Sequence, residues 1–129
     1  MEKQQYVPET MIAISESEEV RKLVGEILSN GGFECHIINP KRALLSHHSA
    51  ALEKNKNPII LDMQLQEPMS KSLVRQILKE TELSRVIVIS HNAVQTESLN
   101  QKGFVHVVEY PMRGVILMSA IDDCVGDDD

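Results

Sequence analysis

Residues 57–68 read NPIILDMQLQEP, and this stretch decides the fold because its apolar run ends directly on a carboxylate, Asp62. A short apolar run bounded by turn residues is typical of a strand buried on both faces of a sheet. An unpaired carboxylate in a protein core costs on the order of several kcal/mol, much of a domain's net stability. We therefore expect Asp62 either to reach water at the strand end or to be placed there for chemistry.

Apolar runs and helical periodicity alternate on both sides of this stretch. This alternation predicts an α/β fold, a doubly wound, flavodoxin-like parallel sheet in the order 2-1-3-4-5 with helices on both faces. Predicted strands cover 10–14, 34–39, 58–62, 85–90 and 104–109; predicted helices cover 20–28 with a stop at 30–32, 43–54, a segment from about 70, 93–101 with a stop at Gly103, and 112–125.

Length and composition favour one folded domain and exclude several function classes. The 129 residues fit a single domain over 10–125, with an extension at 1–9 and an acidic tail or linker start at 126–129. With 19 acidic against 13 basic residues and a net charge of -6, binding to a nucleic-acid backbone is not expected. No apolar run approaches the roughly 20 residues that span a bilayer, so we expect a cytoplasmic protein without membrane contact. Cys35 and Cys124, far apart and outside any CxxC pair, are expected to be reduced.

Polar side chains follow the predicted strands where each one ends. Doubly wound sheets place functional groups at the carboxyl ends of their strands, so we expect these side chains along one edge. Asp62 then lies where a strand leaves the core for a polar cleft. The residues at these ends are Ser15-Glu16-Ser17, Asp62, Ser90-His91 and Glu109-Tyr110-Pro111.

With these residues at the strand ends, the chain from about Thr10 to Val125 resembles the CheY-like receiver domain of two-component response regulators. The family pattern is an acidic pair after strand one, a phospho-accepting Asp ending strand three, Ser or Thr ending strand four, and Lys-Pro ending strand five. The resemblance implies a cis bond between the last two residues. It implies these roles: Asp62 as phospho-acceptor, Ser90, Tyr110 and Pro111 as the switch, and Glu16, Asp62 and the Gln64 carbonyl as magnesium ligands.

Two positions depart from this pattern, and both remove charge. Ser15 stands at the first acid, and Tyr110 stands where the lysine precedes Pro111. Phosphoryl transfer to a carboxylate depends on a divalent cation and a fixed positive charge. Tyr110 is neutral near pH 7, with a reference pKa of about 10. Magnesium binding by Glu16 and Asp62 is therefore expected to be weak, and no other cofactor is expected.

The same residues also have structural explanations. Ser15 and Glu18 fit a capping box for the first helix, with Glu16 as an acidic first-turn residue. Ser90, or equally Asn92, fits a cap for the turn that follows strand four. His91 is bulkier than the residue that receivers usually carry there, and we expect it to screen Asp62 from a phosphodonor.

Three function classes follow. The first is a degenerate pseudo-receiver, not an enzyme, that acts mainly as a protein-interaction module in phosphorelay signalling. The second is a working receiver phosphorylated on Asp62. The third, a flavodoxin-like cofactor enzyme, ranks last because SESEEV (residues 15–20) has no glycine to cradle a phosphate.

The expected partner is a histidine kinase, an output domain or another signalling protein. The resemblance places its binding face on the predicted helix 93–101, strand 104–109 and helix 112–125, which also form the expected surface of a homodimer. Candidate contacts on this face are Gln95, Glu97, His106 and Arg113.

Overall fold

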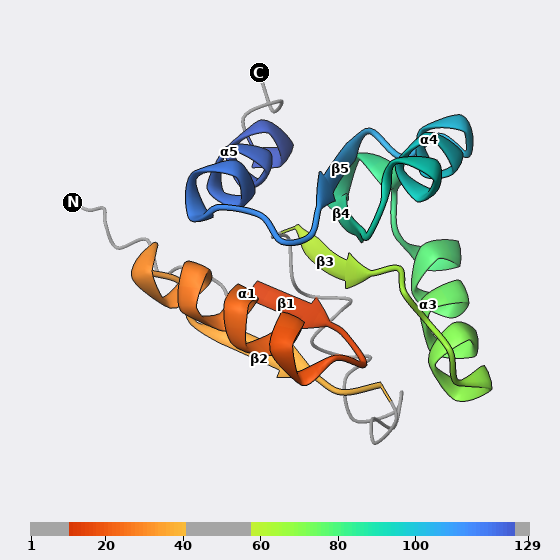
Figure 1. Cartoon of the computed structure of the whole chain (residues 1–129), viewed down its shortest axis with the longest axis horizontal. Coiled ribbons are helices and arrows are strands. Elements are labelled where there is room, and N and C mark those ends of the chain that lie inside the picture. The colour runs from red at the N-terminus through yellow and green to blue at the C-terminus, as the bar shows by residue number, and fades with distance from the viewer. Residues whose placement is uncertain (1–10, 41–57, 126–129) are drawn as a thin grey trace.

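The computed structural model describes residues 11–40 and 58–125, and the strands in these ranges form one parallel sheet. Its order is β2-β1-β3-β4-β5, which confirms the predicted topology (Figure 1). Strand one lies inside the sheet, between β2 and β3. The strands are β1 (Met11–Ile14), β2 (Cys35–Ile38), β3 (Ile59–Asp62), β4 (Val86–Ser90) and β5 (His106–Glu109).

The described helices are α1 (Glu18–Asn30), α3 (Pro68–Glu80), α4 (Ala93–Gln101) and α5 (Gly114–Val125), with a 3-10 turn η1 at Leu83–Arg85. The predicted helix 43–54 lies outside the described residues. α3 begins two residues earlier than predicted because Pro68 occupies its first turn, where a missing N–H costs nothing. α5 begins two residues later than predicted, and Met112 instead lies buried in the core just before it.

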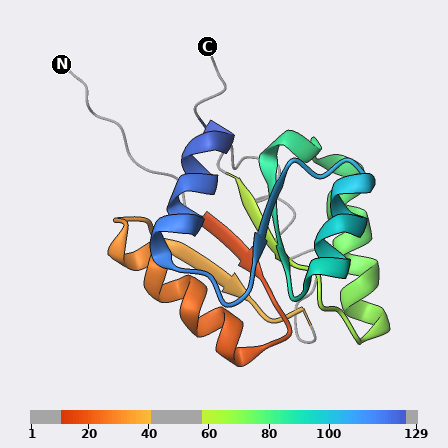
Figure 2. The same cartoon turned by 45° about the horizontal axis from the view of Figure 1, so that its top comes forward.

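The helices form one layer on each side of the sheet. Figure 2 shows α1 and α5 on one side and α3 and α4 on the other. Alternate residues of β3 enter the two cores: Ile60 packs in the cluster of α1 and α5, while Ile59 and Leu61 pack in the cluster of α3 and α4. All four residues of β3 are buried, as its apolar sequence predicts.

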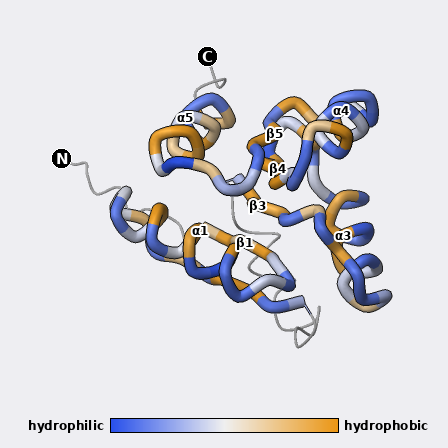
Figure 3. Tube along the Cα trace, viewed as in Figure 1, coloured by the Kyte–Doolittle hydropathy of each residue, from blue (hydrophilic) through white to orange (hydrophobic). Residues whose placement is uncertain are grey.

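The apolar stripes of the helices match this two-layer packing, and Figure 3 shows hydrophobic residues along the strands and on the helix faces that meet them. The first helix ends at Asn30, within the predicted stop at 30–32. Its C-cap Gly31 has φ -84, and the left-handed residue is Gly32, at φ 88. Gly31 packs closely against α5: a Cβ there would lie 2.9 Å from the terminal methyl carbon of Met118, whose flexible side chain would have to shift.

Candidate functional site

The carboxyl ends of β1, β3, β4 and β5 lie at the same edge of the sheet, because all strand pairs are parallel and in register. This edge brings Asp62 together with Ser15 from the loop after β1 and His91 from the loop after β4. Three strands thus supply one polar cluster. The expectation that the strand-end groups gather at one edge is correct for these three residues.

Asp62 is almost completely buried, with 1% of its surface exposed. Its Oδ2 accepts a hydrogen bond from the Ser15 hydroxyl at 2.6 Å. Its Oδ1 accepts the backbone N–H of Gln64 at 3.1 Å and lies 2.7 Å from Nε2 of His91. Of the two alternatives raised by the sequence, water at the strand end is therefore excluded, and the carboxylate is satisfied by protein donors.

The prediction that Ser15 forms a capping box with Glu18 is wrong. The N-cap of α1 is Ser17, whose side chain accepts the N–H of Val20 at 3.3 Å. Ser15 is 3% exposed and turns inward to Asp62, while its Oγ also accepts the N–H of Ser17 at 3.0 Å. A short hydroxyl–carboxylate contact is a charge-assisted bond, stronger than the cap it displaces.

His91 contacts the carboxylate that it was expected to screen. The Nε2–Oδ1 contact is 2.7 Å, and the His91 side chain is only 15% exposed. Its ring centroid lies 5.3 Å from that of Tyr110, with an interplanar angle of 38°. When His91 is protonated at both nitrogens, it places a positive charge against Asp62 in a mostly water-excluded site.

The cluster contains Ser, Asp and His, but in an order that does not activate a nucleophile. In a hydrolytic triad the histidine lies between the serine and the aspartate. Here Asp62 is in the middle, and the Ser15 hydroxyl donates a hydrogen bond to the carboxylate. Ser15 is therefore not activated for attack.

Glu16 serves the loop after β3. Its carboxylate accepts the backbone N–H of Gln66 at 3.1 Å and that of Glu67 at 3.0 Å. Glu67 is the N-cap of α3 and makes no capping bond with its own side chain. Glu16 thus satisfies amides at the start of α3, where a negative charge is also favoured by the helix dipole.

The hydrogen bonds of Asp62 and Glu16 determine whether these residues can bind magnesium. Mg²⁺ needs carboxylate oxygens that face a common point at about 2 Å. The oxygens of Asp62 and Glu16 face separate sets of N–H and O–H donors, and the described residues hold no group of three or more acidic, His or Cys side chains that could bind a metal. Glu16, Asp62 and Gln64, as arranged here, do not fit a magnesium ion, and we derive no step through one.

Ser90 ends β4, is fully buried, and is held by α4. Its hydroxyl donates to the backbone oxygen of Asn92 at 2.8 Å. Oγ1 of Thr96 lies 2.7 Å from Ser90 Oγ and 2.7 Å from Oε2 of Glu109. Sequence reasoning missed Thr96, since a threonine inside a helix carries no signal of such a link. Asn92 is the N-cap of α4, as its alternative prediction stated.

Tyr110 and Pro111 follow β5. Their peptide bond is cis, which confirms the prediction. The Tyr110 N–H donates to the Ser90 oxygen at 2.8 Å, and the half-buried ring packs on the core and near His91.

The candidate partner residues divide into two groups. Glu97 and Arg113 are exposed, and large apolar side chains just before β5 and in the first turn of α5 are exposed as well: Val105 by 68%, Val115 by 65% and Ile116 by 48%. His106 is only 9% exposed. Gln95 is half-buried, with its amide bonded to the loops after β3 and β4.

No protein-family model and no curated protein matches this chain in sequence. Solved structures do match. A response regulator receiver domain protein from Clostridium thermocellum superposes with a TM-score of 0.72 at 17% identity, over 91% of this chain and 94% of that one. The fold is that of receiver domains. Chemotaxis protein CheY4 from Vibrio cholerae superposes with a TM-score of 0.70 at 14% identity, over 92% of this chain and 100% of that one. The beryllofluoride-activated NtrC4 receiver domain dimer superposes with a TM-score of 0.68 at 16% identity, over 92% of this chain and 98% of that one.

At these identities the likeness to receivers establishes the fold. Within residues 11–40 and 58–125, no helix is long and apolar enough to cross a membrane.

Proposed function

We propose that this chain is a degenerate receiver domain over residues 10–125, which works in the cytoplasm as a protein-interaction module of two-component signalling. In this proposal the unmodified form is the working form. The observation that carries it is the state of Asp62: it is 1% exposed, and Ser15, Gln64 N–H and His91 already occupy its two oxygens.

This arrangement is poorly suited to accepting a phosphoryl group. The attacking carboxylate oxygen must be open to the donor, and the transferred group needs fixed positive charge around it. The His91 ring takes up space beside Oδ1, and Tyr110 provides a neutral phenol where receivers have a lysine. His91 thus occupies, within the chain, the space beside Asp62 that a phosphoryl donor needs.

The second candidate is a working receiver phosphorylated on Asp62. It is favoured by one observation, the retained placement of Asp62 at the end of β3 beside β4 and its terminal Ser90. For this candidate, His91 must swing away and Ser90 must leave Asn92 and Thr96.

The proposed partner is a histidine kinase, an output domain or another signalling protein, bound at the α4-β5-α5 face. On these elements, exposed Glu97 and Arg113 supply charged groups and exposed Val105, Val115 and Ile116 supply apolar ones, the kinds of contact found at interfaces. Buried His106 and the internally bonded Gln95 are not retained as contacts. A homodimer through this face is an alternative, since the NtrC4 receiver matched above is described as a dimer.

Acetyl phosphate with magnesium, read by intact-protein mass spectrometry, tests the proposal. We expect no phosphorylated species and no shift of NMR signals near Ser90 or Tyr110 on adding beryllofluoride. Stoichiometric labelling that disappears in Asp62→Asn would instead establish the second candidate.

The partner face is tested with charge reversals. Arg113→Glu should weaken binding of the cognate signalling protein, while Asp62→Asn should leave it intact. Lys22→Glu, at an exposed lysine on α1, is the matched control. Equal loss in Arg113→Glu and Lys22→Glu would place the interface elsewhere.

A further inference from the structure

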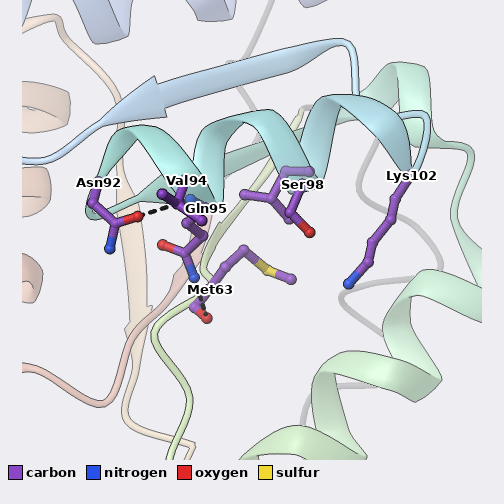
Figure 4. A pocket seen from close by; sticks show the side chains of 7 residues that line it. Met63, Asn92, Val94, Gln95, Ser98 and Lys102 are labelled. Carbon is purple, nitrogen blue, oxygen red and sulfur yellow. Dashed lines mark hydrogen bonds between the residues drawn. The ribbon is translucent and has the colours of Figure 1, made fainter.

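A second surface lies beneath α4, away from β5. It is an open groove of about 430 Å³ between α4 and the loop after β3 (Figure 4). Three apolar side chains and four polar ones line it: Met63, Val94, Leu99, Asn92, Gln95, Ser98 and Lys102. None of them is a carboxylate.

The residues on α4 form a continuous stripe along the groove. Val94, Ser98 and Lys102 follow one another at four-residue spacing, so they share one side of the helix. At 1.5 Å per residue, Val94 and Lys102 are separated by about 12 Å along the axis. The groove thus has an apolar end, where Val94 is 80% exposed beside Met63, and a cationic end at Lys102.

The polar end offers donors without partners. Within residues 11–40 and 58–125, the Lys102 ammonium has no ion pair and the Ser98 hydroxyl no hydrogen bond. Lys102 is also the C-cap of α4, where the helix dipole stabilises a positive charge. This explains why a lysine stands there, but it does not explain the apolar groove beside it.

Charge decides the occupant. The groove lining holds one lysine and no carboxylate, so its charge is complementary to a carboxylate, whereas the net charge of -6 repels a polyanion such as nucleic acid. We infer that this groove binds an amphipathic helix of a partner protein, with an apolar side chain against Met63 and Val94. A glutamate about two turns away on that helix pairs with Lys102.

Gln95 connects the groove to the buried site. Its amide nitrogen donates to the Met63 oxygen at 3.2 Å, and its amide oxygen accepts the His91 N–H at 2.7 Å. A helix that presses on Met63 therefore acts on the loop that carries His91. This link adds to the proposed function, but docking in the groove does not depend on it.

The probe is an alanine-rich peptide of about 16 residues, long enough to be helical, with one leucine and one glutamate seven residues apart. Seven residues span about 10 Å, close to the length of the stripe. Titrated to about 1 mM into the ¹⁵N-labelled chain, it should shift the amide signals of Met63, Gln95, Ser98 and Lys102. The same peptide with glutamine in place of glutamate should bind more weakly, by about threefold.

Variants of the chain make the test specific. Lys102→Glu should weaken binding of the glutamate peptide by about fivefold to tenfold. Lys102→Gln, which does not place a negative charge at the C-terminus of α4, should weaken it by about threefold. Lys22→Glu on α1 should have no effect.

Absence of shifts, shifts outside the groove, or equal losses in Lys102→Glu and Lys22→Glu would overturn the inference. Groove signals that move with protein concentration alone would assign the groove to a second copy of the chain, and would overturn it too.

Discussion

Asp62 and Ser90 end neighbouring strands, yet each is satisfied by a different part of the molecule. Asp62 is held by Ser15, Gln64 and His91, while Ser90 is held by Asn92 and by Thr96, which reaches Glu109. In a receiver that switches, the hydroxyl responds to the modified carboxylate. Here the two side chains have separate hydrogen-bond partners. A change at one reaches the other through the backbone, since His91 follows Ser90, or through Tyr110, which bonds to the Ser90 oxygen and lies near the His91 ring.

The two regions also differ in what holds them. In the Asp62 region the charge-assisted bonds are buried, whereas the Ser90 region combines neutral hydroxyl contacts with one hydroxyl–carboxylate bond that ends at the exposed, solvated Glu109. Charged hydrogen bonds contribute about twice as much as neutral ones. The first region should therefore be the more sensitive to substitution.

The largest effect is expected from rebuilding the missing charges. The variant Ser15→Asp, His91→Ala, Tyr110→Lys removes the contacts that enclose Asp62 and restores an acid and a cation. Acetyl phosphate labelling at Asp62 should rise by about 100-fold or more, the scale of one well-placed charge in such transfers. Circular dichroism checks folding, and the same variant with Asp62→Asn is the control. A folded variant that stays unlabelled would show that more than these contacts blocks the chemistry.

The next effect is on stability, through His91→Ala. It removes the His91 ring from Oδ1 of a buried carboxylate. Removing one partner costs about 3–5 kcal/mol where a charged pair is fully buried. Because His91 is 15% exposed and water can replace it, we expect about 2 kcal/mol. Urea denaturation measures the loss, which should fall below about 1 kcal/mol in an Asp62→Asn background. Equal losses in both backgrounds would mean that packing, and not the pair, is responsible.

Ser15→Ala should lower the unfolding free energy by about 1–2 kcal/mol, since it removes a donor from a buried charged acceptor. Ser17→Ala removes the N-cap of α1 and should cost about 1 kcal/mol. The two serines are separated by their dependence on Asp62. In an Asp62→Ala background the Ser15 change should lose most of its cost, and the Ser17 change should retain it. The reverse outcome would reinstate Ser15 as the cap.

The smallest effect is expected for Thr96→Val, about 1 kcal/mol, because it breaks one neutral contact and one bond to the solvent-exposed Glu109 carboxylate without changing shape much. Thr96→Ser, which keeps the hydroxyl, is the matched control. If the two regions are independent, the NMR signals of the His91 ring stay unchanged in Thr96→Val. A clear shift of these signals would join the regions that the structure separates.

The fold could be predicted because it depends on patterns that the chain repeats. Apolar runs such as 58–61 can only be satisfied inside a sheet covered on both faces, and helical stripes between them leave few topologies. The place of Asp62 follows from the same logic, since it ends such a run. The cis bond at Tyr110-Pro111 could be predicted only from the resemblance to receivers, because the residues alone do not indicate it.

The contacts inside the site could not be predicted. Ser15 had two reasonable partners, a helix amide and Asp62, and only the packed loop decides which is closer. His91 was expected near Asp62, but its direct contact depends on the ring position set by Tyr110 and by the Gln95 bond to its N–H. Such choices depend on a few ångströms of loop placement, which spacing along the chain does not encode.

The bonds from Glu16 to the start of α3 join positions 50 and 51 residues apart. Loop-closure entropy grows only with the logarithm of chain length, so doubling the intervening chain would cost about 0.6 kcal/mol. The contact therefore fixes the loop geometry at the site edge while leaving the length of the chain between its ends almost unconstrained. Insertions between Glu16 and Gln66, placed outside α1, β2 and β3, should be tolerated far better than a one-residue insertion beside Asp62.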